Sequence, residues 1–204
     1  MDRRTALTTI AGALTLVWMP RIASAQTDVL VAALRQGGHT IVFRHGATNP
    51  KQADTDPLRH QNIKKQRMLT DEGRALAREI GAALKSLGIP IAEVKTSKFY
   101  RAIETAKLMN VGKVEPTIDL TEGGLVVPPD ENVRRAKAFR DLVAAPVAAG
   151  KNRLIVSHKP NIIDAFGKDW FEIKEGEASI FRIEAGKSTL VTRLQAAQWK
   201  NLKA

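Results

Sequence analysis

The sequence predicts an α/β fold class, a three-layer α/β/α sandwich around a mostly parallel central sheet. Short apolar segments rich in β-branched residues alternate along the chain with longer segments whose apolar residues recur at helical spacing. Glycine, proline and capping residues mark the ends of several of these segments. Strands that alternate with helices usually form parallel βαβ units, and such a sheet carries helices on both faces.

The individual elements follow from these patterns in order. We expect helices at residues 28–36, 71–87, 98–109 and 130–145, and strands at 39–43, 92–96, 113–118, 153–157, 177–184 and 188–194. The second helix has the clearest signals, because Thr70 can cap it, Asp71 and Glu72 place negative charge in its first turn, and Gly88 ends it. The last two strands alternate apolar and polar residues around a short turn, which predicts a hairpin.

Two helices carry more detailed expectations. Ser97 is placed to cap the helix at 98–109. In the helix at 130–145, one side is apolar and is expected to face the core; it consists of Val133, Ala136, Phe139 and Val143.

Residues 47–68 form a long polar loop, and loops of this length are usually functional lids or disordered. Thr48 and Asn49 at its start either contact a substrate or form a turn. Residues 53–57 read as a turn rather than a cation-binding loop. The loop also holds a basic cluster that either attracts anions or, as we favour, is simply solvated: Lys64, Lys65 and Arg67.

The first 25 residues have the organisation of a secretory signal peptide. Arg3 and Arg4 precede an apolar run at residues 5–19, and Ala23–Ala25 matches an A-x-A cleavage site. The run is shorter than the roughly 20 apolar residues of a membrane span, which favours a cleaved signal over a retained anchor. The paired arginines point weakly to the twin-arginine export route. We therefore expect a signal peptide at 1–25, a single domain at 26–204, a periplasmic or secreted protein and no stable membrane insertion after cleavage.

Composition restricts the classes of function. The chain has 204 residues, no cysteine and a formal net charge of +11. The absence of cysteine excludes disulfides, thiolate nucleophiles and Cys-ligated zinc. The basic surplus favours anionic ligands, but it is scattered without a long run of like charges, so we expect a small phosphorylated substrate rather than nucleic acid. The histidines lack metal-ligand spacing, and we expect neither a metal nor another cofactor.

Polar residues follow three of the expected strands at the point where each strand ends. Arg44, His45 and Gly46 come directly after the first strand, and His158 follows the fourth. Arg101 lies shortly after the second strand, in the first turn of the next helix. Because ligands of parallel α/β sheets bind beyond the carboxyl ends of the strands, we expect these side chains to converge on one crevice if the three strands are neighbours.

These residue types suit a phosphoryl group. Arg44 and Arg101 can each donate two hydrogen bonds to phosphate oxygens, and His158 can donate another. A neutral imidazole is a nucleophile near neutral pH, so His45 can attack phosphorus and form a phosphohistidine. A carboxylic acid would then protonate the leaving oxygen and later activate water.

On these motifs the chain resembles the histidine phosphatase superfamily (branch 1), the group that includes the cofactor-dependent phosphoglycerate mutases. The family's Arg-His-Gly signature stands at Arg44–Gly46, its Ser-x-x-x-Arg-Ala-x-x-Thr-Ala motif at Ser97–Ala106, and its second histidine at His158. The resemblance covers about residue 39 to the C-terminus. It implies a phosphoglycerate mutase-like fold, His45 as the phosphorylated nucleophile, and a phosphate pocket of Arg44, Arg101 and His158.

The resemblance also suggests a general acid. Many relatives carry a glutamate shortly after the third strand, and Glu122 is the best match here. Three other carboxylates remain rivals for this role: Glu175, Glu177 and Asp164. The longer motif that follows this glutamate in mutases is missing, and only 57 positions separate Arg101 from His158, where mutases usually carry an insertion. Both departures favour hydrolysis over mutase chemistry.

We therefore expect an exported, metal-independent phosphomonoester hydrolase that works through a phosphohistidine on His45. A non-catalytic binder of phosphorylated envelope components is the alternative from a different class, and it would bind phosphate without turnover. A phosphomutase is a weaker alternative, and it would transfer phosphate between two hydroxyls of one substrate.

Overall fold

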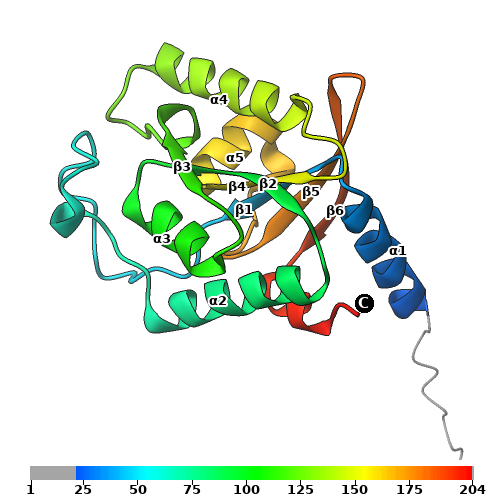
Figure 1. Ribbon diagram of the computed structural model, residues 1–204. Helices are drawn as coiled ribbons and strands as arrows, with labels where there is room; N and C mark the ends of the chain where they lie inside the picture. Colours follow the sequence, from blue (N-terminus) through cyan, green and yellow to red (C-terminus); the bar gives the residue numbers. More distant parts are fainter. Residues whose placement is uncertain (1–21, 204) are drawn as a thin grey trace, which may run out of the picture.

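The structure, a computed structural model, describes residues 22–203 and contains a six-stranded sheet between two layers of helices (Figure 1). The strands lie in the order β3-β2-β4-β1-β5-β6. They are β1 (His39–Arg44), β2 (Ile91–Ser97), β3 (Val114–Thr117), β4 (Asn152–Ser157), β5 (Ala178–Glu184) and β6 (Lys187–Leu194). The helices are α1 (Ile22–Gln36), α2 (Asp71–Ser86), α3 (Tyr100–Met109), α4 (Pro129–Ala144) and α5 (Lys159–Phe166).

Two apolar cores lie on opposite faces of the sheet and confirm the predicted three layers. Ile41 and Phe43 of β1 belong to the core that packs under α1, α2 and α3. Val42, which lies between them, belongs to the core under α4 and α5. Successive side chains of a strand point to opposite faces, so a central strand that is apolar throughout must be covered on both sides.

The strand order brings the expected site segments together. β1 pairs in parallel with β4, and β4 pairs in parallel with β2, so the carboxyl ends of these three strands are adjacent. The predicted neighbourhood of the strands is therefore confirmed. β5 and β6 extend the sheet beyond β1 as an antiparallel hairpin, which was also predicted.

Three local predictions need correction. Ser97 does not cap α3, because the helix begins at Tyr100 with Phe99 as its N-cap and Ser97 is the last residue of β2. Val133 is 67% exposed, because it borders an open pocket between α4 and α5 instead of the core. Helix α5 was not predicted, since its eight residues are too few to show a helical period.

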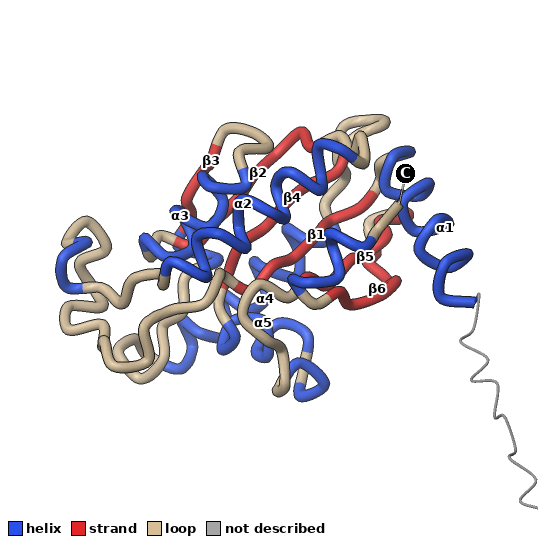
Figure 2. The backbone as a smooth tube through the Cα atoms, turned by 90° about the horizontal axis from the view of Figure 1, so that it is seen from below, coloured by secondary structure: helices blue, strands red, loops and turns tan. Residues whose placement is uncertain are grey.

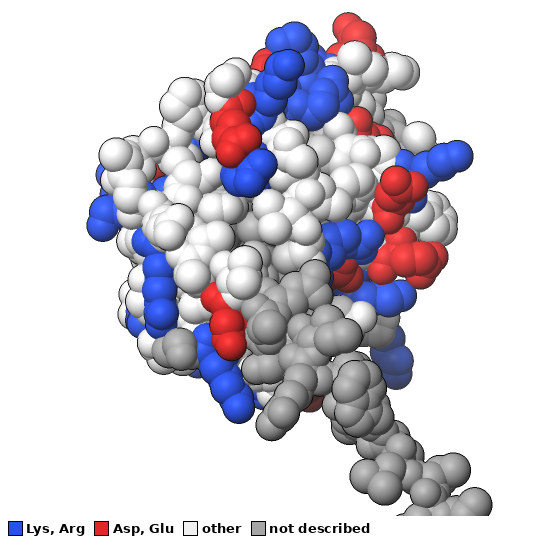
Figure 3. Space-filling model, turned by 90° about the vertical axis from the view of Figure 1, so that its right-hand side faces the viewer, with Lys and Arg blue, Asp and Glu red and all other residues white. Residues whose placement is uncertain are grey.

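The N-terminal predictions lie largely outside the described part of the chain. Residues 1–21, which hold most of the expected signal peptide, are not described, and α1 begins at Ile22 instead of residue 28. Its backbone helix includes the expected cleavage site at 23–25, so cleavage and the division at residue 25 stay predictions. No helix within residues 22–203 combines the length and the apolar character needed to cross a membrane. On the face shown in Figure 3, basic and acidic side chains are interspersed.

Candidate active site

His45 follows β1 directly and is 2% exposed. Its Nδ1 lies 2.8 Å from the carbonyl oxygen of Gly46, and because a carbonyl can only accept, Nδ1 carries the ring proton. The lone pair is therefore on Nε2. Burial, with a further contribution from the positive charge of Arg101, lowers the pKa of His45 well below its usual range. The ring is neutral at pH 7 and has a nitrogen available for nucleophilic attack.

Gly46 is needed where the end of β1 meets the start of α2. A Cβ at this position would lie 2.9 Å from the carbonyl oxygen of Gly73, closer than side chains tolerate. The Gly46 N–H donates to Thr105 Oγ1 at 3.0 Å, and the Thr105 hydroxyl donates to the carbonyl of Arg101 at 2.7 Å. This chain of hydrogen bonds explains the threonine of the helix motif, because it joins the nucleophile segment to α3.

His158 lies beside the nucleophile, with its ring centroid 5.1 Å from that of His45. The Ser97 hydroxyl oxygen accepts from the Phe99 N–H at 3.0 Å and lies 2.6 Å from His158 Nε2. The Ser97 hydroxyl can donate its proton to His158 Nε2, which then carries no hydrogen. We therefore assign the ring proton of His158 to Nδ1. Nδ1 is 3.5 Å from a carboxylate oxygen of Glu122 and has no hydrogen-bond partner among the described residues. Ser97 thus orients a donor in the site, a role that its expected cap function did not suggest.

Arg101 is fully buried in the first turn of α3. Its Nη1 donates to both carboxylate oxygens of Asp54, at 3.0 and 3.1 Å, and its Nη2 donates to Glu122. Its Nε is buried and unpartnered within the described chain. A buried donor without a partner costs about 1–3 kcal/mol, so this nitrogen indicates a place for an anionic ligand.

Arg44 reaches the site from the end of β1. Its Nη1 donates to the carbonyl of Ile173 at 2.8 Å, and its Nη2 lies 3.4 Å from the carboxylate of Glu175. As with Arg101, its Nε is buried and lacks a partner in the part of the chain that is described. The predicted convergence of Arg44, His45, Arg101 and His158 therefore agrees with the structure.

Sequence reasoning missed Asp54, and it favoured a solvated role for Arg67 that the buried Nε of this residue corrects. Arg67 has a buried Nε without a partner in residues 22–203, and its charge helps to lower the pKa values of His45 and His158. Its backbone N–H donates to Asp54 Oδ1 at 2.9 Å. No spacing pattern in the sequence marks either residue. For Arg67 the available signal was its place in the basic cluster of the loop, for which anion binding was the less favoured of two roles.

Two of the four expected carboxylic acids contact the site. Glu122 contacts Arg101 and lies close to His158, and Glu175 contacts Arg44 and accepts from the Thr48 hydroxyl at 2.9 Å. The side chains of Glu122 and Glu175 are 20% and 29% exposed, so both can exchange protons with water.

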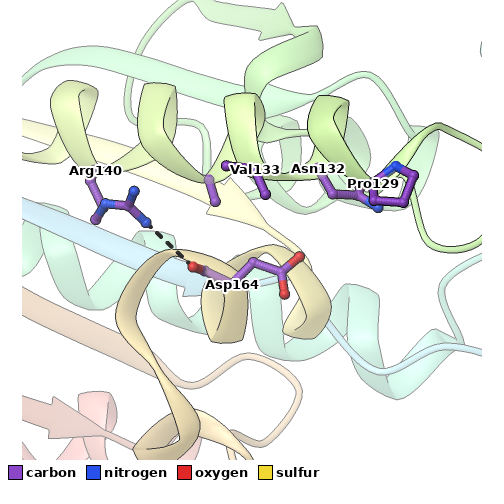
Figure 4. Close-up of a pocket in the computed structure, with 6 residues that line it drawn as sticks. Pro129, Asn132, Val133, Arg140 and Asp164 are labelled. Carbon is purple, nitrogen blue, oxygen red and sulfur yellow. Dashed lines mark hydrogen bonds between the residues drawn. The ribbon is translucent and has the colours of Figure 1, made fainter.

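The other two carboxylic acids are engaged elsewhere. Glu177 is 4% exposed and accepts from Arg193 Nε at 2.6 Å and from the Lys174 N–H at 2.9 Å. Asp164 lies on α5 at a cavity of about 320 Å³ that α4 also lines, where the Arg140 guanidinium donates to its backbone carbonyl (Figure 4). Burial raises the pKa of Asp164, but its carboxylate faces this separate cavity.

Thr48 and Asn49 have different surroundings. Thr48 is buried and bonded to Glu175, which places it beside the site. Asn49 is exposed, and its side chain accepts from the Lys51 N–H at 3.0 Å, so it forms the turn that was one of its two expected roles. Among residues 22–203, no cluster of three or more His, Asp or Glu side chains is arranged to hold a metal ion.

The geometry agrees with a match to a known family. The model of the histidine phosphatase superfamily (branch 1) matches residues 40–125, which include Arg44, His45, Arg101 and Glu122. Over residues 40–125 the chain is therefore similar to the histidine phosphatase superfamily, and the fold agrees with this similarity. The name of this family agrees with the phosphatase activity that the sequence predicts. No curated protein sequence matches the chain.

Solved structures share the fold at low sequence identity. The protein histidine phosphatase SixA in complex with tungstate is 21% identical, with a TM-score of 0.53 over 81% of this chain and 99% of that chain. YhfR from Bacillus stearothermophilus is 18% identical, with a TM-score of 0.54 over 76% and 95%. A phosphoserine phosphatase from Entamoeba histolytica in complex with 3-phosphoglyceric acid is 16% identical, with a TM-score of 0.52 over 76% and 95%.

Proposed function

We propose that the chain is an exported phosphomonoester hydrolase that forms a phosphohistidine on His45 without a metal ion. One observation carries this proposal: the free Nε2 of a neutral, buried histidine lies among donors that lack partners in the described chain. Those donors are the Nε groups of Arg44 and Arg101 and Nδ1 of His158. They could hold the phosphoryl oxygens while negative charge spreads over them in the transition state.

The reaction has two steps. First, His45 Nε2 bonds to phosphorus, the bond to the leaving oxygen breaks, and Glu122 gives its proton to that oxygen. Next, the Glu122 carboxylate takes a proton from water, the water oxygen bonds to phosphorus, and the bond to Nε2 breaks to release phosphate. The Gly46 carbonyl holds the proton on Nδ1 throughout, so Nε2 remains the reacting nitrogen.

A panel of phosphomonoesters, tested with the purified protein, examines this function. We expect the wild type to hydrolyse at least one class of ester. In His45→Ala the rate of hydrolysis should fall by at least about 10³-fold, as for removal of other nucleophiles. His39→Ala is the matched control, because His39 is a buried histidine at the opposite end of β1. Phosphate binding without hydrolysis of any ester would instead identify a binding protein.

The leaving group distinguishes Glu122 from Glu175 as the acid. Phosphate esters with a poor leaving group need protonation, whereas p-nitrophenyl phosphate has a good leaving group and needs little. Glu122→Gln should therefore lose about 10²-fold or more on alkyl phosphates but much less on p-nitrophenyl phosphate. Glu175→Gln should lower both rates equally, and the reverse pattern would assign the acid to Glu175.

A further inference from the structure

The phosphate-binding arginine of the proposed site already holds a loop carboxylate. Both oxygens of Asp54 lie at hydrogen-bond distance from Arg101 Nη1, and Asp54 Oδ1 also accepts from the Arg67 N–H. An incoming phosphate at the vacant Nε would share the Arg101 guanidinium and its positive charge with this carboxylate. Asp54 therefore already compensates part of the positive charge that would attract an anion to this site.

The loop that carries Asp54 is ordered by its own hydrogen bonds. Gln66 is fully buried; its side chain donates to the His60 carbonyl at 2.6 Å and accepts from the Tyr100 N–H at the start of α3 at 2.7 Å. Gln52 donates to the Gln66 carbonyl at 2.9 Å and accepts from the Met68 N–H at 2.9 Å. The backbone view in Figure 2 shows this loop extending from the domain beside α3. These contacts hold Asp54 against Arg101.

Carboxylates offset part of the positive charge of the site before a ligand binds. Three guanidinium groups, those of Arg44, Arg67 and Arg101, influence His45, and both site histidines are held neutral by burial. Three carboxylates contact these groups, namely Asp54, Glu122 and Glu175. In the proposed product complex Glu122 has regained its proton, so the charged carboxylates that repel a phosphate dianion are Asp54 and Glu175. Asp54 is the one that bonds to Arg101 through both oxygens.

We propose that Asp54 is an intramolecular competitor for phosphate that sets the affinity of the site for inorganic phosphate, the reaction product. This inference rests on the proposed function. After hydrolysis, the carboxylate at Arg101 Nη1 weakens the attraction of the guanidinium for the product phosphate and repels it, which limits product inhibition. A site with three guanidinium groups and no such competitor would hold the product tightly, because charge-assisted bonds from arginine to phosphate are strong.

Asp54→Asn tests the competition directly. Asparagine keeps Oδ1 as an acceptor for the Arg67 N–H and Arg101 but removes the charge and one acceptor oxygen. We expect the dissociation constant of inorganic phosphate, measured by titration calorimetry, to fall by about tenfold, the effect of losing one partly screened like charge. The inhibition constant of phosphate against p-nitrophenyl phosphate should fall in parallel.

Two variants control for charge and fold. Asp56→Asn removes the same charge from the same loop, where Asp56 accepts from Asn62 Nδ2 at 3.2 Å, and it should leave phosphate affinity unchanged. Asp54→Glu keeps the charge and should stay near the wild-type affinity. An unchanged or weaker affinity in Asp54→Asn, or an equal gain in Asp56→Asn, would overturn the inference. So would a large loss of kcat in Asp54→Asn at unchanged phosphate affinity, because Asp54 would then act as the proton donor.

Direct binding also separates this inference from the proposed function. If the wild type and Asp54→Asn both fail to bind phosphate, the proposed function itself fails. If the wild type binds phosphate and Arg101→Lys does not, phosphate binds at the proposed site. The comparison of Asp54→Asn with the wild type then decides the role of Asp54.

Discussion

Two arginines are buried at opposite ends of the neighbouring parallel strands β2 and β4, and their surroundings differ. Arg153, near the start of β4, is 3% exposed and uses Nε and both Nη groups as donors. Its partners are the Glu93 carboxylate and three carbonyls at the end of α4, those of Leu142, Ala145 and Pro146. Arg101, beyond the carboxyl end of β2, has two carboxylates as partners, and its Nε has none within residues 22–203.

These different surroundings distinguish a structural arginine, Arg153, from a ligand-binding arginine, Arg101. Backbone carbonyls at a helix end are fixed, and they keep both Nη groups of Arg153 bonded, while its Nε is paired with Glu93. The partners of Arg101 are carboxylates on loops, each with a side chain 20% exposed, and both can yield to another anion. Burial of an arginine alone therefore does not indicate function. Function is indicated when one of its nitrogens lacks a partner and the partners of the others can be replaced by a ligand.

The largest effect is expected when Arg101 and Arg153 are each replaced by lysine, in two separate variants. Arg101→Lys loses the planar fork, so kcat/KM should fall by about 10²–10³-fold with little change in the free energy of unfolding. Arg153→Lys leaves buried carbonyls without donors, so the free energy of unfolding should fall by about 2–4 kcal/mol while kcat per folded molecule is retained. Urea denaturation and steady-state kinetics measure both, and similar profiles for the two variants would remove the distinction.

The next effect concerns two buried serines at the ends of neighbouring strands. Ser97→Ala removes the hydroxyl that orients His158, so kcat/KM should fall by about 10- to 100-fold. Ser157→Ala removes a hydroxyl that donates to the Leu120 carbonyl at 2.8 Å, so it should lower stability by about 1–2 kcal/mol and leave kcat near the wild-type value. Equal kinetic losses would show that Ser97 has only a packing role.

The buried histidines predict a dependence of stability on pH. Burial lowers the folded-state pKa of His45 and His158, whereas the unfolded chain takes up these protons near pH 6.5. Stability from these groups is therefore complete above about pH 6.5 and decreases as the pH falls below it, by up to about 1.4 kcal/mol per pH unit and histidine. Urea denaturation between pH 8 and 5 should give a smaller slope in His45→Asn than in the wild type, and identical slopes would mean that His45 is protonated in the folded protein.

The smallest effect is expected for Thr105→Val. The substitution removes the acceptor of the Gly46 N–H and the donor to the Arg101 carbonyl without changing the shape of the side chain. We expect a loss of about 1–2 kcal/mol in the free energy of unfolding and less than a tenfold loss in kcat/KM. A loss of activity as large as that of Arg101→Lys would mean that this connection, and not the arginine, controls the site.

The sequence predicted the layers, most elements and the convergence of four site residues, because each rests on a local pattern plus the rule that ligands bind at the carboxyl ends of parallel strands. It did not predict Asp54 or Arg67, since a long irregular loop has no period from which to infer where a side chain points. It assigned Ser97 to a helix cap because a serine before a helix is usually one. The hydrogen bond between Ser97 and His158 depends on the pairing of β2 with β4, which local sequence does not encode.

Trapping the intermediate tests the phosphohistidine most directly. The protein is mixed with a rapidly hydrolysed phosphomonoester, quenched in alkaline denaturant, digested and examined by mass spectrometry, because a phosphohistidine survives in base and is lost in acid. We predict a phosphoryl group on the peptide that contains His45, absent from His45→Ala and removed by acid. A phosphoryl group on His158, or active turnover with neither histidine labelled, would contradict the assignment of His45 as the nucleophile.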